Sequence, residues 1–220
     1  MRQLNDLIIR CSQSWWLFLL SVIVAFGSLF AVFGPIQIAF AELTGGLTPF
    51  DFQNSLSVEQ IFEQLAVWNE AAVQLYYAFS FVDFFFPFFA GLFLASIAAF
   101  SLRHLAPRLY DRVVRRRLFL LLMLGPAFDW LENLCALFVI GRYPAEMTAA
   151  AGLLVVAKQG KLAAVMLTQL IAFSLLVLAA GRWVWTRVAR GRRSTEPLHS
   201  ATPARQRLGA ENPVSIMPVC

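Results

Sequence analysis

An apolar stretch of the chain, residues 118–140, carries three polar side chains that could do acid–base or ligand-binding chemistry. Asp129, Glu132 and Asn133 stand at positions i, i+3 and i+4, so a helix would place them on one face. The stretch is long enough to cross a bilayer, where a charge at the centre costs at least about 2.5 kcal/mol. We therefore expect these groups to face other helices, a cavity or a ligand rather than lipid.

A further acid, Asp83, lies in another apolar stretch, residues 73–101. Tyr76 and Ser80 precede it at helical spacing, so two hydroxyl groups line the same face as the acid. A rise of about 1.5 Å per residue places Asp83 and Asp129 near the membrane midplane if their helices run in opposite directions. We expect the acids to share one polar layer with the amide: Asp83, Asp129, Glu132 and Asn133.

Each of these two stretches also contains a proline close to its carboxyl group. Pro87 cannot donate a hydrogen bond to the carbonyl group of Asp83, and Pro126 cannot donate one to that of Leu122. Each helix should therefore have a loosened turn and a free carbonyl oxygen. Such irregular backbone is tolerated at membrane depth where it is buried or lines a cavity. An ordinary proline kink without a site is the alternative interpretation.

A cation for this layer is available just before the fourth apolar stretch, residues 162–180. The chain has only two lysines, Lys158 and Lys161, and both lie there. Either could extend toward Glu132, and we favour Lys161. Burial and a second carboxylate nearby both disfavour the charged form of a carboxyl group, so the three acids are not all expected to be ionised at once.

These groups are compatible with several kinds of chemistry. Two carboxylates and a lysine could act as acid and base on a lipid, and three carboxylates with Asn133 could hold a hard cation. Asn133 could equally form a hydrogen bond between helices. No nucleophile motif, phosphate-binding glycine loop, histidine–cysteine metal set or nucleotide signature accompanies them, so we assign no metal and leave the cofactor open. Four spans without a repeat count against a transporter unless the protein is a dimer, and a homo-oligomer stays open.

The composition places the chain in the membrane class. Of 220 residues, 59% are hydrophobic and 14% are charged, a profile that one soluble core of this size cannot hide. The net charge of +5 does not indicate nucleic acid, because the basic residues flank apolar spans. The predicted fold is an all-α integral membrane protein, a four-transmembrane-helix bundle with a short extracytoplasmic amphipathic helix. The cysteines lack ligand or disulfide spacing and are expected to be free thiols: Cys11, Cys135 and Cys220.

The first span is predicted at residues 15–33, after a cytoplasmic N-terminus of residues 1–14, and it ends before Gly34-Pro35. Ala39-Phe40-Ala41 resembles a signal-peptide cleavage site. The apolar run is longer than the roughly 7–15 residues of a signal-peptide core, however, so we favour an uncleaved helix.

Residues 36–72 form a segment without a lysine or arginine, which we expect to be extracytoplasmic. Ser57 and Gln60 have the spacing of a capping box and predict a helix over residues 58–70. Its apolar stripe fits a helix that lies on the membrane surface or, alternatively, a lid over the outer mouth of the bundle.

Lysines and arginines are distributed unevenly between the two faces of the predicted membrane domain, residues 15–185. Of the 18, all but three lie in the N-terminus, in the loop between the second and third spans, or after the fourth span, where Arg182 precedes the tail of residues 186–220. The positive-inside rule then puts both termini of the predicted multi-pass protein in the cytoplasm. The basic tail is expected to be disordered. The three basic residues that remain, on the opposite face of the membrane, are Arg142, Lys158 and Lys161.

Two motifs carry a resemblance to known proteins: Val82-Asp83-Phe84-Phe85-Phe86-Pro87 and Phe128-Asp129-Trp130-Leu131-Glu132-Asn133. With Tyr143-Pro144 and a lysine entering the fourth helix, they resemble an uncharacterised family of bacterial four-span inner-membrane proteins. This resemblance covers most of residues 10–185 and implies a topology and a polar site, but no reaction. A weaker likeness is to the four-helix EXPERA architecture of sterol isomerases and the sigma-2 receptor. The histidine and glutamate set of the isomerases is missing here, so isomerisation is not implied.

The sequence therefore predicts a carboxylate-rich pocket inside the membrane that binds a lipid or small amphiphile. One alternative is a membrane-embedded lipid-modifying enzyme that uses the buried carboxylates as acid and base. Another is a subunit of a proton- or cation-coupled transporter. The residues expected at the pocket are Asp83, Asp129, Glu132, Asn133, Lys161, Tyr76 and Ser80.

Overall fold

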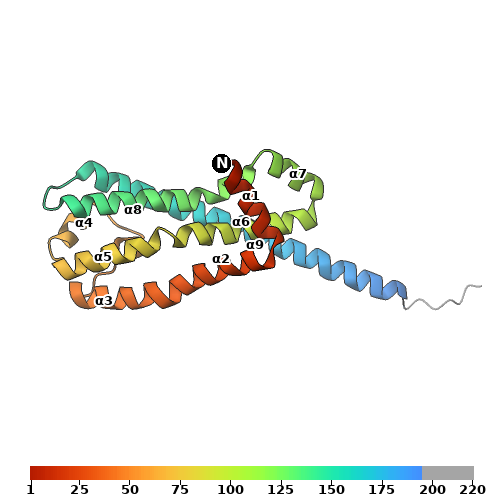
Figure 1. Cartoon of the computed structure of the whole chain (residues 1–220), viewed down its shortest axis with the longest axis horizontal. Coiled ribbons are helices and arrows are strands. Elements are labelled where there is room, and N and C mark those ends of the chain that lie inside the picture. The colour runs from red at the N-terminus through yellow and green to blue at the C-terminus, as the bar shows by residue number, and fades with distance from the viewer. Residues whose placement is uncertain (195–220) are drawn as a thin grey trace, which may run out of the picture. The chain divides into compact units, whose positions relative to one another are not determined.

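The computed structural model describes residues 1–194, and all regular structure in this range is helical (Figure 1). Met1–Arg182 forms one compact unit, and a second unit begins at Trp183. The prediction of an all-helical chain with four helices long and apolar enough to cross a membrane is confirmed for the described residues. These four segments are Trp15–Thr44, Glu70–Leu105, Leu118–Arg142 and Thr148–Ala189.

The first apolar segment is longer than the sequence predicted. It consists of three successive pieces: α2 (Trp15–Ser28), a π-helical turn η1 (Leu29–Phe33) and α3 (Gly34–Thr44). The helix continues past Gly34-Pro35 because Pro35 lies in the first turn of α3, where a missing backbone N–H costs least. Ala39-Phe40-Ala41 therefore lies inside a helix, with the Phe40 ring fully buried.

The connection from α3 to the next apolar segment contains two short helices, η2 (Phe50–Phe52) and α4 (Val58–Leu65). Ser57 and Gln60 form the capping box at the start of α4, with both reciprocal hydrogen bonds present. Helix α4 ends at Leu65, before the predicted end at residue 70, because Asn69 caps the next helix by accepting from the Ala72 N–H at 2.8 Å. The apolar side chains of α4 are buried in the protein core, so they are not available to a membrane surface.

The second and third apolar segments are both interrupted next to their acids. The second consists of α5 (Glu70–Asp83) and α6 (Phe86–Leu105), and the third of a 3-10 helix η3 (Leu118–Met123) and α8 (Leu124–Arg142). The break between α5 and α6 lies one turn before Pro87, and the change from η3 to α8 lies just before Pro126. Both interruptions lie where the sequence predicts a loosened turn.

The N-terminal residues form a helix, α1 (Arg2–Gln13), that packs Ile8 and Cys11 into a core shared with α6. A basic helix, α7 (Pro107–Arg115), contributes Tyr110 to the same core. Figure 1 shows α1 and α7 at one end of the bundle and α3, α4 and the start of α5 at the other. The core at this other end is rich in aromatic rings: Phe40, Phe50, Trp68, Tyr76 and Phe79.

The last helix, α9 (Thr148–Ser194), begins well before the predicted fourth span at residues 162–180. Its first turns include Ala149–Ala157, which favour a helix and place both lysines on it. Residues 183–194 continue the helix, and the Arg187 guanidinium lies 4.7 Å from the Trp183 ring centroid. The tail expected to be disordered, residues 186–220, is thus helical as far as residue 194, and the rest lies outside the described residues.

Candidate functional site

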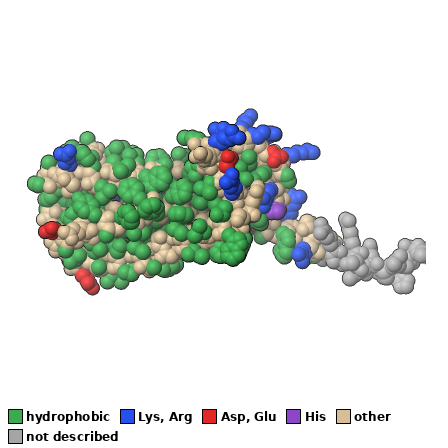
Figure 2. Space-filling view, in the orientation of Figure 1, with side chains coloured by type: hydrophobic (Ala, Val, Ile, Leu, Met, Phe, Trp, Pro, Cys, Tyr) green, Lys and Arg blue, Asp and Glu red, His purple; other side chains and the backbone are tan. Residues whose placement is uncertain are grey.

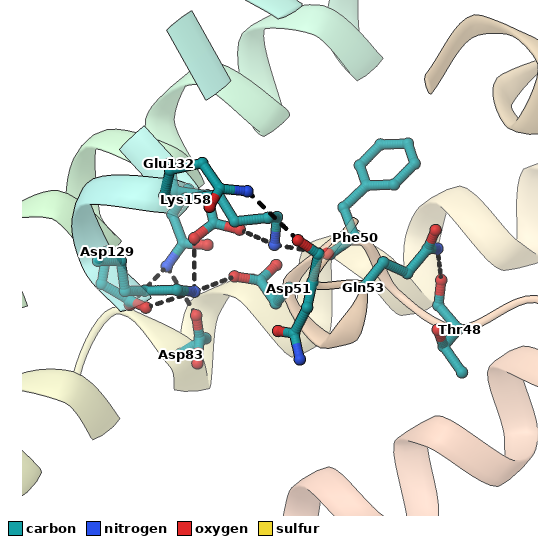
Figure 3. A network of polar contacts seen from close by, with 12 residues as sticks. Thr48, Phe50, Asp51, Gln53, Asp83, Asp129, Glu132 and Lys158 are labelled. Atoms are coloured by element: carbon teal, nitrogen blue, oxygen red, sulfur yellow. Dashed lines mark hydrogen bonds and ion pairs between the residues drawn. The ribbon is translucent and has the colours of Figure 1, made fainter. Parts of the chain in front are cut away.

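Seven polar side chains from four elements meet in the interior of the bundle (Figure 3). Asp83 ends α5, and the polar face of α8 contributes its two acids and its amide. The lysines extend from α9, and Asp51 comes from η2 in the connecting segment. We call this set the polar cluster: Asp51, Asp83, Asp129, Glu132, Asn133, Lys158 and Lys161.

Glu132 is the most deeply placed acid of the polar cluster, with no exposed surface. Both lysines pair with it: Lys158 with Oε1, and Lys161 with Oε2 at 2.5 Å. A buried carboxylate is costly unless it is paired. Two ammonium groups on one carboxylate therefore explain how this acid lies in a helix interior, and they resolve the open choice between the lysines in favour of both.

Lys161 also connects Glu132 to two other acids. Its Nζ lies 2.8 Å from Asp129 Oδ1 and 3.4 Å from Asp51 Oδ1. Asp51, Asp129 and Glu132 each have an oxygen within 4.8 Å of the others, an arrangement that could hold a hard cation. The ammonium group of Lys161 already contacts all three carboxylates, so a metal ion would have to displace it.

Asp51 is the member of the polar cluster that the sequence analysis missed. The other acids of residues 36–72 are exposed, whereas the η2 turn carries Asp51 inward between two phenylalanines. Lys158 Nζ donates to the Phe50 carbonyl oxygen at 2.8 Å, and the Tyr76 hydroxyl donates to Asp51 Oδ2 at 3.0 Å. The Phe50 ring stacks on Trp68 with centroids 4.7 Å apart. The available signal was the pattern Phe-Asp-Phe, an acid between two residues that prefer burial.

Asp83 meets the other acids through an amide instead of a lysine. The Asn133 side-chain N–H₂ group donates to Asp83 Oδ2 at 2.7 Å and lies 3.4 Å from Asp129 Oδ2. Asp83 is only 5% exposed, yet no lysine or arginine in the described part of the chain forms an ion pair with it. Asn133 thus forms a hydrogen bond that links α8 to α5, which is the second of the two roles considered for it from the sequence.

Of the two hydroxyl groups expected on the same helix face as Asp83, only that of Tyr76 forms a hydrogen bond with the polar cluster. Tyr76 is fully buried and joins the polar cluster through its hydrogen bond to Asp51. Ser80 is also buried, but its Oγ has no hydrogen-bond partner among the described residues. The structure therefore brings together every predicted site residue except Ser80.

Carbonyl oxygens at the two interruptions accept hydrogen bonds from other helices, although at the first interruption the acceptor belongs to Phe84 and not to the predicted Asp83. At the break between α5 and α6, the Trp130 indole N–H donates to the Phe84 carbonyl oxygen at 2.7 Å. In η3, the Leu122 carbonyl oxygen accepts from the Thr168 hydroxyl at 3.5 Å. These bonds fix the loosened turns to α8 and α9, and so they hold the backbone around the polar cluster in place.

A cavity of about 290 Å³ lies next to the polar cluster. Four members of the cluster line it: Asp51, Asp83, Asp129 and Lys161. These four side chains contact one another or share a contact with Asn133, so they occupy one end of the cavity. Leu94 and Gln169 also line the cavity and lie two or three helical turns further along α6 and α9, so the cavity extends away from the charges. Most of its remaining wall is apolar, with four phenylalanine rings among the lining residues: Phe33, Phe52, Phe79 and Phe86.

Comparison with protein-family models, curated proteins and solved structures found no match to this chain. The chemistry of the cavity therefore has to be derived from its own side chains. These are carboxylates, one shared lysine and phenylalanine rings, in a space that is polar at one end and apolar along its length.

Proposed function

We propose that this chain is a multi-pass protein of a bacterial inner membrane that binds a lipid or small amphiphile inside its helical bundle. The observation that carries this proposal is the cavity, which places a charged end and an apolar body in one space. An amphiphile has the same two parts. Binding pockets of small molecules typically have volumes of roughly 300–1,000 Å³, so a cavity of about 290 Å³ suits a small amphiphile or part of a lipid.

The exposed surface supports insertion in a membrane. Large hydrophobic side chains project from α2, η1 and α9, and hydrophobic atoms cover most of the visible face of the bundle in Figure 2. Soluble monomers rarely expose a continuous apolar surface of this kind. Examples with more than half of the side chain exposed are Trp16, Ile23, Phe30, Met166 and Leu170.

The distribution of arginines supports an orientation with both termini in the cytoplasm. In Figure 2 the basic side chains gather near α1 and α7. Two of the three basic residues on the other face, Lys158 and Lys161, are ion-paired inside the polar cluster. Arg142 is then the exposed basic residue of that face within the described residues, which strengthens the charge difference used by the positive-inside rule.

Native mass spectrometry of the protein purified in a mild detergent tests the binding proposal. Ala90 lines the cavity, whereas Ala163 is exposed on α9 and does not line it, so the same change to phenylalanine can be made at both positions. We expect wild type and Ala163→Phe to retain a bound amphiphile and Ala90→Phe to lose it. Equal retention by both variants, or none by wild type, would contradict the proposal.

A further inference from the structure

We propose that the ligand of the cavity carries a cationic ammonium group, which pairs with Asp83, and an apolar chain, which fills the rest of the space. This inference rests on the proposed function and specifies its ligand class. It follows from two independent features of the described residues. One is the distribution of charges in the polar cluster, and the other is the set of aromatic rings beside Asp83.

The charges of the polar cluster are unequal, because four carboxyl groups face two lysines. Glu132 pairs with both lysines, and Lys161 also reaches Asp51 and Asp129. Asp83 has only the neutral amide of Asn133, which donates to its Oδ2. Its Oδ1 accepts no hydrogen bond within residues 1–194. Asp83 is therefore the carboxyl group of the cluster that lacks a cation.

Asp83 lies on the wall of the cavity, so a ligand can supply the missing cation. An anionic head group would meet an excess of carboxylates, and Lys161 already contacts three of them. A hard metal ion prefers several oxygen ligands, but the converging oxygens of Asp51, Asp129 and Glu132 hold Lys161. An organic ammonium group needs only one carboxylate and tolerates apolar surroundings better than a metal ion does.

The aromatic rings on the same wall also favour an ammonium group. Phe33 is the central ring, with centroids 5.3 Å from Phe79, 5.0 Å from Phe86 and 6.1 Å from Phe52. All four rings line the cavity together with Asp83. Aromatic faces attract cations, and an aromatic cage is a common way to bind ammonium ligands. A carboxylate beside several phenylalanines thus combines both elements of such a site.

The test is isothermal titration of the full-length protein in detergent with three probes of equal chain length. These are octyltrimethylammonium, which is permanently charged, octanol, which is neutral, and octanoate, which is anionic. We expect wild type to prefer octyltrimethylammonium. Asp83→Asn keeps the shape of the side chain and should weaken this binding at least about tenfold, because a buried charge pair is lost. Octanol binding should stay within about twofold, since a hydroxyl group gains little from the charge.

Two further variants separate the possible results. Phe86→Leu removes one aromatic ring from the cavity wall and should weaken the binding of octyltrimethylammonium but not of octanol, which tests the inference without changing Asp83. Glu42→Gln removes an exposed acid outside the cavity and should change the binding of neither probe.

Equal binding of ammonium and alcohol by wild type, or ammonium binding that survives both Asp83→Asn and Phe86→Leu, overturns the ammonium inference. If octanol binding is still blocked by Ala90→Phe, the proposed amphiphile binding stands. If no probe binds in a way that Ala90→Phe blocks, both proposals fail.

Discussion

Lys161 connects carboxylates that come from separate parts of the chain. Asp51 belongs to the segment between the first two apolar helices, whereas Asp129 and Glu132 belong to α8. The Lys161 side chain is mostly buried, so water cannot replace its contacts with these carboxylates if the ammonium group is removed. Stability should therefore depend on this one cation more than on any exposed basic residue.

Replacement of Lys161 with methionine should destabilise the protein by about 3–5 kcal/mol, because it leaves buried carboxylates without their shared partner. The measurement is the midpoint of thermal or denaturant unfolding in detergent, with Arg142→Met as the control for loss of an exposed positive charge. Asp129→Asn, added to Lys161→Met, removes one of the orphaned charges and should recover part of the loss. A Lys161→Met variant as stable as Arg142→Met would show that the ion pairs contribute nothing.

Cys11 offers a test of packing at the end of the bundle near α7. Its thiol lies in the core between α1 and α6, and burial raises its pKa above the ordinary value for cysteine. A raised pKa means less thiolate at any given pH, and the thiolate is the reactive form. In a Cys135→Ser, Cys220→Ser background, Cys11 should react slowly with a maleimide in the folded protein and rapidly in the unfolded protein. Equally rapid reaction in both states would place α1 away from the core.

Close contact between α8 and α9 depends on a glycine. A Cβ atom added at Gly160 would lie 2.8 Å from the Phe128 ring, whereas one added at Gly152, on the same helix, would have no heavy atom within 4 Å. This pair of positions separates steric fit from helix propensity. A side chain at residue 160 would therefore displace the Phe128 ring or move α9 away from α8, on the same helix that pairs both of its lysines with Glu132.

Gly160→Ala should destabilise the protein by about 1–3 kcal/mol, as overpacking in a core generally does. Gly152→Ala should stabilise it by roughly 0.5–1 kcal/mol, because alanine loses less backbone entropy than glycine in a helix. Both changes are measured by unfolding in the same detergent. If the two variants shift stability in the same direction, the close contact of α8 and α9 is wrong.

The elements that could be predicted from the sequence are those with local signals. The length of the apolar runs predicted the four segments, and Pro87 and Pro126 predicted the two interruptions. The spacing of Asp129, Glu132 and Asn133 predicted the polar face of α8. The ends of the helices were less predictable. Pro35 was expected to stop the first helix, but a proline in the first turn of α3 does not interrupt its hydrogen bonds.

Asp51, the residue of the polar cluster that was not predicted from the sequence, is held in place by residues that are distant from it in the sequence. Lys158 and Tyr76 hold the turn that carries it, and they lie 108 residues after Phe50 and 25 residues after Asp51, respectively. Contacts at such sequence separations produce no periodic pattern of residues from which they could be predicted. The sequence therefore indicated which residues need partners, while the choice of partner was set by the packing of the whole bundle.

At the scale of the whole molecule, the charge difference between the two ends makes orientation measurable. Tyr143 and Arg116 are both exposed and lie at opposite ends of the third apolar segment. In a background in which the native cysteines are replaced by serine, Tyr143→Cys should react with a membrane-impermeant thiol reagent in intact cells. Arg116→Cys should react only after the membrane is permeabilised. The reverse pattern would invert the orientation inferred from the arginines.

The most direct measurement is a density map of the full-length protein in lipid nanodiscs. The ammonium-amphiphile proposal predicts elongated density between α6, α8 and α9, with its head beside Asp83 and its chain along Pro87 and Val165, which line the cavity. A cavity closed by side chains, or a head group that lies beside Lys161 and away from Asp83, would contradict it.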